Sequence, residues 1–316
     1  MKIIFFGSGA FAVPILEAIV KKSHSLLLVV TQPDRSKGRH LHLSQTPIKT
    51  WAQSNGLKIF QPMDINALSS LELLKKENAD VYMVASYGQI LSADILALPK
   101  ICVNAHASLL PKYRGAAPVA YALINGERAT GVTFIKMNEK MDQGDIILKK
   151  SISIQKSDNA QKLQGRLSYL AASTAGHVLS KIEKNKFKLL KQNEKQATYA
   201  PMIKKKDGFI HWETTSKEIY NRFLGCFGWP GSLTYYKGKL LKIFSLGLGR
   251  RKSKGCFGEI IFADGDTLEV ACKKGTIVIR EVLLESHKRM DVKSFLAGHE
   301  VKVGDFLGME KPLQDE

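Results

Sequence analysis

The chain has 316 residues, 44% of them hydrophobic, and this length allows two domains because one hydrophobic core seldom grows beyond about 250 residues. No run of about 18 apolar residues is present, so the composition excludes a membrane-spanning helix. The formal net charge of +18 is more than solubility requires, and it favours a polyanionic partner or an anionic surface.

Cysteine usage and the N-terminus indicate the cellular compartment. Four cysteines lie far apart without a CxxC pair, and no paired histidines stand at metal-ligand spacing: Cys102, Cys226, Cys256 and Cys272. We therefore predict reduced thiols and no structural zinc. Gly7 ends the first apolar run too early for the core of a signal peptide. These features predict a cytoplasmic protein.

The first element in chain order is a βα unit. Residues 2–22 read as an apolar strand, a glycine turn and an amphipathic helix, with Pro14 in an early turn where proline is tolerated. The glycine turn, Gly7-Ser8-Gly9, is reminiscent of a dinucleotide site, but Ala12 stands where GxGxxG has its third glycine. The sequence therefore disfavours a nucleotide cofactor at this turn.

The elements that follow alternate between strands and helices. Apolar runs predict strands, and helical spacing predicts helices between them: strands at 25–32, 57–60, 81–85 and 101–104, and helices at 48–54, 65–77 and 93–98. Such alternation is typical of a parallel sheet. Residues 33–47 contain Pro, Gly and basic residues with little apolar periodicity, which predicts an exposed loop.

A polar pair stands where the strand at 101–104 ends. Asn104 and His106 are two residues apart, so in an extended chain they project to the same side. Open α/β sheets bind ligands beyond the carboxyl ends of their strands. An amide donor beside an imidazole suits the oxyanion and proton transfers of acyl transfer. From the spacing alone, a satisfied core histidine beside a strand-ending asparagine is the more common explanation.

The next segments complete the first domain. We expect a helix at 116–125, a strand at 132–137, a strand at 146–154 and a long helix from about 158 to 184. The loop between the two strands contains Asp142, and a loop aspartate is usually solvated. Between residues 181 and 206, nine Lys stand against two Glu in a polar stretch without clear periodicity. This stretch is typical of a basic linker.

The last third of the chain predicts a small β-barrel. Short apolar runs separated by glycine turns lie at 233–236, 240–246, 258–262, 268–271 and 276–281. Residues 219–258 contain no acidic side chain but eight basic ones, with aromatic residues interleaved. Such a run suits a phosphate backbone, although an exposed basic hairpin without a partner would look the same.

Several strings together resemble the folate-dependent formyltransferases. They are HASLLPKYRGAAP at 106–118, MDQGD at 141–145, TYAP at 198–201 and NRFLGCFGWPGS at 221–232, so the resemblance runs along nearly the whole chain. It implies an α/β, Rossmann-like formyltransferase domain with a mainly parallel sheet at 1–188. A basic linker at 189–206 then leads to an OB-like, tRNA-binding β-barrel at 207–316. Ser8-Gly9 departs from the Thr-Pro that this family usually has.

The resemblance also implies an activity and its residues. It is strongest to the family members that transfer a formyl group from 10-formyltetrahydrofolate to the amino group of initiator methionyl-tRNA. Asn104, His106 and Asp142 match the catalytic residues, and Asp142 would orient His106 and favour its imidazolium form. The resemblance further implies that Arg39 lies in a loop that meets tRNA, and it implies the folate-binding residues Tyr87, Gly88, Gln89, Ser108, Leu109, Leu110 and Pro111. The acid-free basic run adds four candidate tRNA-binding residues: Arg250, Arg251, Lys252 and Lys254. We expect a monomer that binds no metal and does not associate with a membrane.

Two other functions use parts of the same pattern. A formyltransferase for a small amine, such as an amino sugar or a purine-pathway amine, would need the same core strings, but the basic second domain argues against it. A non-catalytic RNA-binding protein on this fold would be expected to lack Asn104, His106 or Asp142, and all three are present.

Overall fold

The computed structural model describes residues 1–22, 24–37, 42–252 and 255–308. The chain divides into two compact units, each made of separate segments. Unit 1 comprises Met1–Pro118, Arg128–Gln155 and Lys162–Pro201. Unit 2 comprises Val119–Glu127, Lys156–Gln161 and the described residues from Met202 onward. Residues 189–201, which lie in the linker predicted from the sequence, therefore belong to unit 1.

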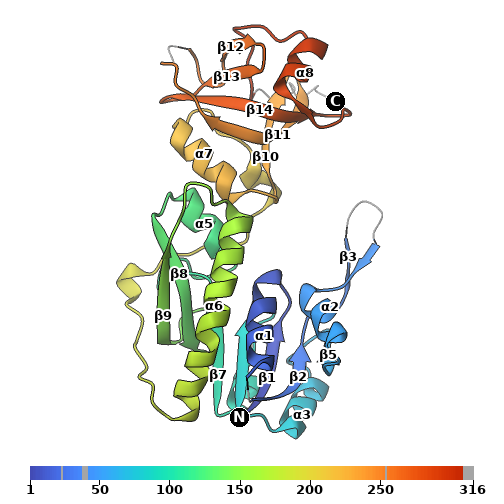
Figure 1. Ribbon diagram of the computed structural model, residues 1–316, viewed down its shortest axis with the longest axis vertical. Helices are drawn as coiled ribbons and strands as arrows, with labels where there is room; N and C mark the ends of the chain where they lie inside the picture. The colour runs from blue at the N-terminus through green and yellow to red at the C-terminus, as the bar shows by residue number, and fades with distance from the viewer. Residues whose placement is uncertain (23, 38–41, 253–254, 309–316) are drawn as a thin grey trace, which may run out of the picture. The chain divides into compact units, whose positions relative to one another are not determined.

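Unit 1 is built on a seven-stranded sheet (Figure 1). Its order is β5-β2-β1-β6-β7-β8-β9. The strands are β1 (Lys2–Gly7), β2 (Ser25–Val30), β5 (Ile59–Phe60), β6 (Val81–Ala85), β7 (Ile101–His106), β8 (Ala129–Lys136) and β9 (Asp145–Ser153). The first five are parallel, whereas β8 and β9 are antiparallel to their neighbours. The predicted Rossmann-like, mainly parallel sheet is thus confirmed.

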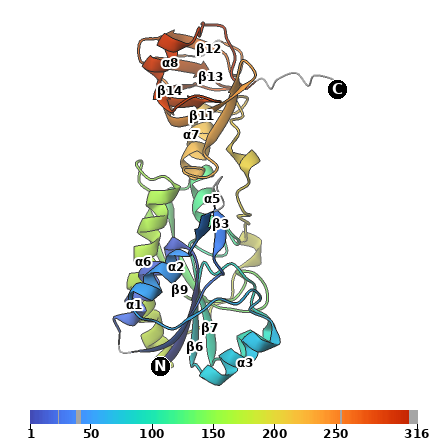
Figure 2. The ribbon, with the colours of Figure 1, turned by 90° about the vertical axis from the view of Figure 1, so that its right-hand side faces the viewer.

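Helices cover both faces of this sheet. In Figure 2, α1 (Val13–Val20), α2 (Pro47–Ser54) and α6 (Ala160–Glu183) lie on one side of the strands and α3 (Leu68–Glu77) on the other. A short helix, α4 (Ala93–Ala97), packs on the α3 side, and its Ile95 shares a core with Ile4 and Phe6 of β1. Successive strand residues face opposite sides, and both faces of β1 are buried. Parallel strands covered by helices require this burial.

The segment predicted as an exposed loop after β2 contains a two-stranded ribbon. Strands β3 (Arg35–Lys37) and β4 (His42–Ser44) pair antiparallel with each other and not with the large sheet. The pattern here lacks apolar alternation because neither strand contributes to a core, so the ribbon could not be predicted. Arg39 lies outside the described residues.

Unit 2 is an antiparallel sheet that closes on itself. The order β10-β11-β14-β13-β12 is formed by β10 (Ser232–Tyr236), β11 (Lys239–Leu248), β14 (Thr276–Leu284), β13 (Thr267–Ala271) and β12 (Ile260–Asp264), with β15 (Met290–Asp291) beside β14. Residues 305–308 then join its two edges. Leu307 N donates to Gly258 O at 2.8 Å, and Gly308 N donates to Tyr235 O at 2.9 Å. The sheet therefore forms a small barrel around one apolar core.

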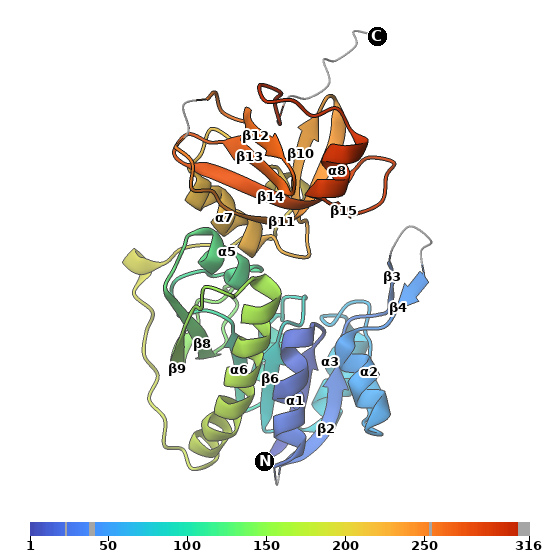
Figure 3. The same cartoon turned by 45° about the horizontal axis from the view of Figure 1, so that its top comes forward.

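Helical elements of unit 2 were not all predicted. The predicted helix at 116–125 is α5 (Pro118–Ile124), but α7 (Ser216–Gly225) and α8 (Val292–Gly298) were missed. Both pack against the barrel strands (Figure 3). A capping box begins α7, in which Thr215 and Glu218 each bond the other's backbone N–H. A Thr-x-x-Glu pattern is typical of a helix start. Residues 221–232, which overlap the helix, were assigned to a family motif instead, so no helix was predicted there.

Short 3₁₀ turns complete the described elements: η1 (Ala10–Ala12), η2 (Glu194–Gln196) and η3 (Lys205–Gly208). None of the described helices combines the length and apolar character needed to cross a membrane. The four cysteines carry free thiols, of which Cys256 is exposed. Within the described residues, no three His, Cys, Asp or Glu side chains gather as metal ligands would.

Two glycines test the packing of unit 1. Gly131 lies in β8, where an added Cβ would overlap the Lys150 carbonyl of β9, whereas around Gly165 in α6 the space is open. We expect Gly131→Ala to destabilise unit 1 because the backbone must shift. Gly165→Ala should stabilise it by about 0.5–1 kcal/mol through helix propensity. Thermal melting of both variants checks this, and equal melting temperatures would contradict the packing described here.

Candidate active site

Asn104, His106 and Asp142 lie together at the carboxyl end of β7. The first two occupy alternate positions of the strand and project to the same side, as predicted. Asp142 comes from the loop between β8 and β9. This loop leaves β8 beside Val103, with which Lys136 pairs, so the chain must fold back along β7 to bring Asp142 to Asn104 and His106. Asn104 Nδ2 donates to Asp142 Oδ1 at 3.2 Å, and His106 Nδ1 lies 3.5 Å from the same oxygen.

The second carboxylate oxygen of Asp142 has a backbone partner. Gly115 N donates to Asp142 Oδ2 at 2.8 Å. Gly115 has φ 113°, and an added Cβ would lie 2.7 Å from Ala200 O, so only glycine fits this position without strain. The Asp142 side chain is 11% exposed, so it is not solvated as a loop aspartate usually is.

Both nitrogens of the buried His106 ring face acceptors. Nε2 lies 2.8 Å from Tyr113 O, while Nδ1 faces the Asp142 carboxylate. A neutral imidazole has one N–H and satisfies one of these acceptors, whereas the imidazolium has two and satisfies both. Each ring nitrogen of His106 therefore lies next to an acceptor oxygen.

The loop after β7 is fixed from inside the protein. Thr133 Oγ1 of β8 donates to Ser108 O at 2.7 Å and accepts from Leu110 N at 3.1 Å. The Ser108 hydroxyl donates to Lys112 O at 2.6 Å. The Lys149 ammonium donates to Leu110 O, and burial lowers the pKa of this lysine. The loop thus has a set shape before any ligand binds.

The four loop residues assigned to folate are mostly buried. Ser108 and Leu110 have no exposed surface, and Leu110 packs in a small core with Ile135 and Ile146. Pro111 is also buried, and Leu109 is half-buried. Contacts to a ligand from this loop would therefore come mainly from its backbone and from Leu109. The assignment of these residues to folate stays a prediction.

The turn after β6 lies at the same edge of the sheet, because Val84 of β6 pairs with Asn104 of β7. Ser8 holds this turn: its N–H donates to Ser86 O at 3.0 Å and its hydroxyl donates to Tyr87 O at 3.0 Å. The serine that departs from the family pattern thus ties β1 to the turn.

Each side chain of the predicted folate turn has a structural environment. The Tyr87 ring is buried against Phe6, and burial raises the pKa of its hydroxyl. Gln89 Oε1 accepts from Ile65 N at 2.8 Å. Gly88 has φ 93° and leaves its backbone uncovered by a side chain. Beside it lies Gln32, whose buried Nε2 has no hydrogen-bond partner in the described part of the chain.

The predicted tRNA-binding residues of unit 2 differ in their surroundings. Arg250 and Lys252 are exposed. Arg251 is also exposed, but it pairs with the buried Glu269, Nε to Oε2 at 3.0 Å, and its guanidinium lies over the Phe262 ring at 3.9 Å. Lys254, like Arg39, lies outside the described residues.

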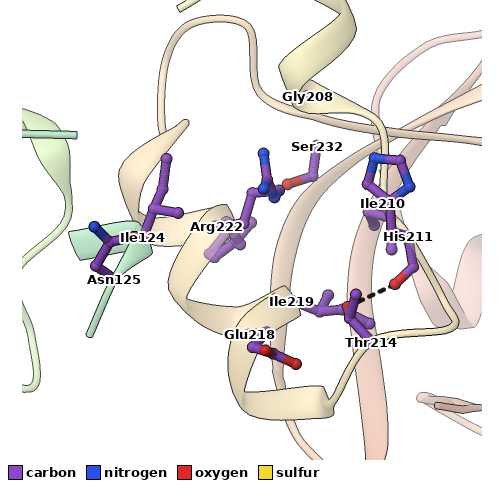
Figure 4. Close-up of a pocket in the computed structure, with 11 residues that line it drawn as sticks. Ile124, Asn125, Gly208, Ile210, His211, Thr214, Glu218, Ile219, Arg222 and Ser232 are labelled. Carbon is purple, nitrogen blue, oxygen red and sulfur yellow. Dashed lines mark hydrogen bonds between the residues drawn. The ribbon is translucent and has the colours of Figure 1, made fainter. Parts of the chain in front are cut away.

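A separate cavity of about 230 Å³ lies within unit 2 (Figure 4). Its polar groups are already engaged by the fold. Arg222 donates to Asp207 O at 3.2 Å, Thr214 Oγ1 donates to His211 O at 2.7 Å, and Glu218 accepts from the Thr215 backbone at 2.8 Å. None of Asn104, His106 and Asp142 lines it, so we do not assign the chemistry to this cavity.

Sequence reasoning missed the residues that support the site. Thr133 and Lys149 lie in strands β8 and β9, where their contacts to the loop depend on strand pairing rather than on local pattern. Arg114 is 1% exposed although it is part of the matched string, and nothing in the sequence indicates that an arginine is buried.

Two family models match the chain. One, described as formyl transferase, matches residues 1–179. The other, described as formyl transferase, C-terminal domain, matches residues 202–300. Together they cover most of both units.

Relatives of nearly equal length carry one description. A methionyl-tRNA formyltransferase of Caldanaerobacter subterraneus subsp. tengcongensis is 40% identical over 309 residues, which are 97% of this chain and 100% of the relative. A methionyl-tRNA formyltransferase of Citrifermentans bemidjiense is 39% identical over 309 residues, covering 98% of this chain and 96% of the relative.

Solved structures share the fold. An N-formyltransferase from Helicobacter canadensis, in complex with folinic acid and dTDP-3-aminofucose, aligns with a TM-score of 0.66 at 20% identity over 88% of this chain and 98% of its own. WlaRD, a sugar 3N-formyl transferase, aligns with a TM-score of 0.64 at 20% identity over 91% of this chain and 99% of its own. At this identity the likeness supports the fold alone.

Proposed function

The chain belongs to the methionyl-tRNA formyltransferase family, and on that premise we propose that it formylates the free amino group of the methionyl moiety of initiator methionyl-tRNA. The formyl donor is 10-formyltetrahydrofolate, and the product serves translation initiation. The observation that carries the proposal is the shared bonding of Asn104 and His106 to the Asp142 carboxylate at the carboxyl end of β7.

The reaction sets three chemical demands. An α-amino group has a pKa of about 8 in model peptides, so it is partly protonated near neutral pH and must lose a proton before it attacks. Attack on a formyl carbon places negative charge on the formyl oxygen. The folate nitrogen must then receive a proton as its bond to the formyl carbon breaks. The donor itself supplies an activated formyl group, so no nucleotide energy is needed.

Asn104 meets the demand for charge stabilisation. One N–H of its amide donates to Asp142, which fixes the orientation of the side chain. Because the amide group is planar, the direction of its second N–H is then fixed as well. This N–H donates to the formyl oxygen as negative charge develops there. A donor held in place before the reaction stabilises an oxyanion without the cost of reorganisation.

His106 contributes positive charge, and Asp142 keeps the His106 ring in position. We propose that His106 acts as an imidazolium next to Asn104, since its Nε2 lies 2.8 Å from Tyr113 O and its Nδ1 lies 3.5 Å from Asp142 Oδ1. Its positive charge favours the same oxyanion, and we assign it as the proton source for the departing folate nitrogen. Water relays the proton that the amine releases. Asp142 therefore acts by orienting both partners rather than by touching the substrate.

The folate contacts are assigned to the two segments beside the catalytic trio, Asn104, His106 and Asp142. We place the donor against Tyr87, Gly88 and Gln89 after β6 and against residues 108–111 after β7. The unpartnered Gln32 Nε2 beside Gly88 supports a ligand with polar atoms at this turn. The uncovered backbone of Gly88 gives such a ligand close access.

The tRNA contacts are assigned to Arg39 and to basic residues of unit 2. The net charge of +18 supports a polyanionic substrate. Exposed Arg250 and Lys252 are free to meet phosphates, and we retain Arg39, Arg251 and Lys254 as further contacts. We place the protein in the cytoplasm as a monomer, where charged initiator tRNA is available.

Substitutions in the trio test the proposed roles. We expect Asn104→Ala and His106→Ala each to lower kcat about 100-fold, because each removes an oxyanion-stabilising or proton-donating group. Asp142→Asn should lower kcat and leave the melting curve unchanged. The assay follows label from 10-formyltetrahydrofolate to charged initiator tRNA, with a dTDP-amino sugar as the competing amine. The exposed His177 of α6 provides the control, His177→Ala.

Two outcomes would contradict this proposal. Wild-type kcat in both alanine variants would remove Asn104 and His106 from the mechanism. Label transferred to the amino sugar and not to the charged tRNA would replace the proposed substrate with a small amine.

A further prediction concerns salt and tRNA affinity. Each phosphate contact releases counterions, so tRNA affinity should fall steeply as salt rises. The double variant Arg250→Glu, Lys252→Glu should raise KM for charged tRNA and flatten the salt dependence, without changing the folate Kd. Arg251 is left intact because it neutralises buried Glu269. The double variant Lys75→Glu, Lys76→Glu, on α3 of unit 1, is the control because it changes the net charge by the same amount. Salt-independent tRNA affinity would contradict the assignment.

A further inference from the structure

Gln192 binds the backbone on both sides of the Asp142 turn. This side chain lies in residues 189–201, far from the turn in sequence but within the same unit. Its Nε2 donates to Asp142 O at 2.7 Å and to Gly144 O at 2.8 Å. Both N–H groups of one amide are therefore used to hold one turn.

Arg114 fixes which way the Gln192 amide points. Gln192 Oε1 accepts from Arg114 Nε at 3.1 Å and from Nη2 at 2.9 Å. Because arginine has only donors, it can face the oxygen of the amide and not the nitrogen. The nitrogen of Gln192 is thereby directed to the two carbonyls of the Asp142 turn.

Arg114 is itself immobilised. It is 1% exposed, and Glu194 accepts from Nη1 at 2.8 Å and from Nη2 at 2.7 Å. This bonding to Glu194 raises the pKa of the guanidinium above its ordinary value. The backbone of Arg114 is tied to the same segment, to Thr198 O at 2.9 Å and from Ala200 N at 2.7 Å. The position of Gln192 is thus determined from two sides.

The Asp142 turn needs such support. Asp142 has φ 55°, in the left-handed region that costs a non-glycine residue about 1 kcal/mol or more. At Gly144, an added Cβ would overlap the Lys136 carbonyl, so the turn is also tightly packed. A residue keeps this conformation when its surroundings impose it. Gln192 bonds the carbonyl of the strained residue itself.

We propose that Gln192 is a positioning residue for formyl transfer, which holds the backbone of Asp142 so that its carboxylate reaches Asn104 and His106. Gln192 does not touch the substrates and acts through Asp142. The inference rests on the proposed function, since it assigns Gln192 a part in that reaction. It also makes the segment that was predicted as a linker a structural part of the active site.

The informative substitution is Gln192→Glu. Glutamate has the size of glutamine and still accepts from Arg114, but it lacks the N–H groups that hold Asp142 O and Gly144 O. We expect kcat to fall about 10-fold, because a small misplacement of catalytic groups costs rate strongly, while KM for folate and for tRNA stays unchanged. Gln196→Ala, at an exposed position of the same segment, is the control and should keep wild-type kcat.

A double-mutant cycle separates positioning from general damage. If Gln192 acts through Asp142, then Gln192→Glu should cause no further loss in an Asp142→Asn background. A damaged fold would lower kcat by the same factor in both backgrounds. Wild-type kcat in Gln192→Glu, or equal losses in both backgrounds, would overturn the inference.

A spectroscopic measurement covers the remaining cases. The ring N–H resonances of His106 report its bond to Asp142, and we expect Gln192→Glu to move them in the direction that Asp142→Asn does. Gln192→Met, of similar size, serves if the glutamate variant fails to fold. Unchanged His106 resonances in the folded variant would overturn the inference. Failure of wild type to formylate methionyl-tRNA would instead contradict the proposed function, and the resonances would still report the positioning.

Discussion

The site depends on one largely buried carboxylate, that of Asp142, which accepts two hydrogen bonds and lies 3.5 Å from His106 Nδ1. Asp142 is 11% exposed, and a charge removed from water must be paired and hydrogen-bonded to be tolerated. Asn104, His106 and the Gly115 backbone supply these partners. The requirement fixes the geometry of the reacting groups, since an amide and an imidazole that share one carboxylate oxygen are held side by side. The same contacts therefore align the catalytic groups and stabilise the buried charge.

Local pattern predicted the parts of the fold that repeat with a period. Alternating strands and helices indicated the parallel sheet, and the two-residue spacing correctly placed Asn104 and His106 on one side of β7. The antiparallel β8 and β9 were not distinguished from parallel strands, because both are apolar runs. Asp142 was assigned by family resemblance alone, since its approach to His106 depends on how β8 and β9 pair. Gln192 gave no signal in a polar stretch without periodicity.

Some residues of the matched strings and of the basic run make contacts within the protein that the sequence does not reveal. Leu110 follows directly on the catalytic strand, yet it packs in a core with Ile135 and Ile146. Arg251 stands in a basic run, yet it neutralises the buried Glu269. A sequence motif records which residues occur together, but it does not separate those that face a substrate from those that support the backbone. Only the packing of each side chain makes that distinction.

The most direct test of the central claim is a crystal structure of the protein with 5-formyltetrahydrofolate, a formyl folate isomer that marks where the donor lies. Our account predicts density for the ligand at the carboxyl ends of β6 and β7, with its formyl group next to the Asn104 amide and the His106 ring. It also predicts that both side chains still share the Asp142 carboxylate. A formyl group bound away from Asn104 and His106, or an Asp142 carboxylate turned away from both, would contradict the account.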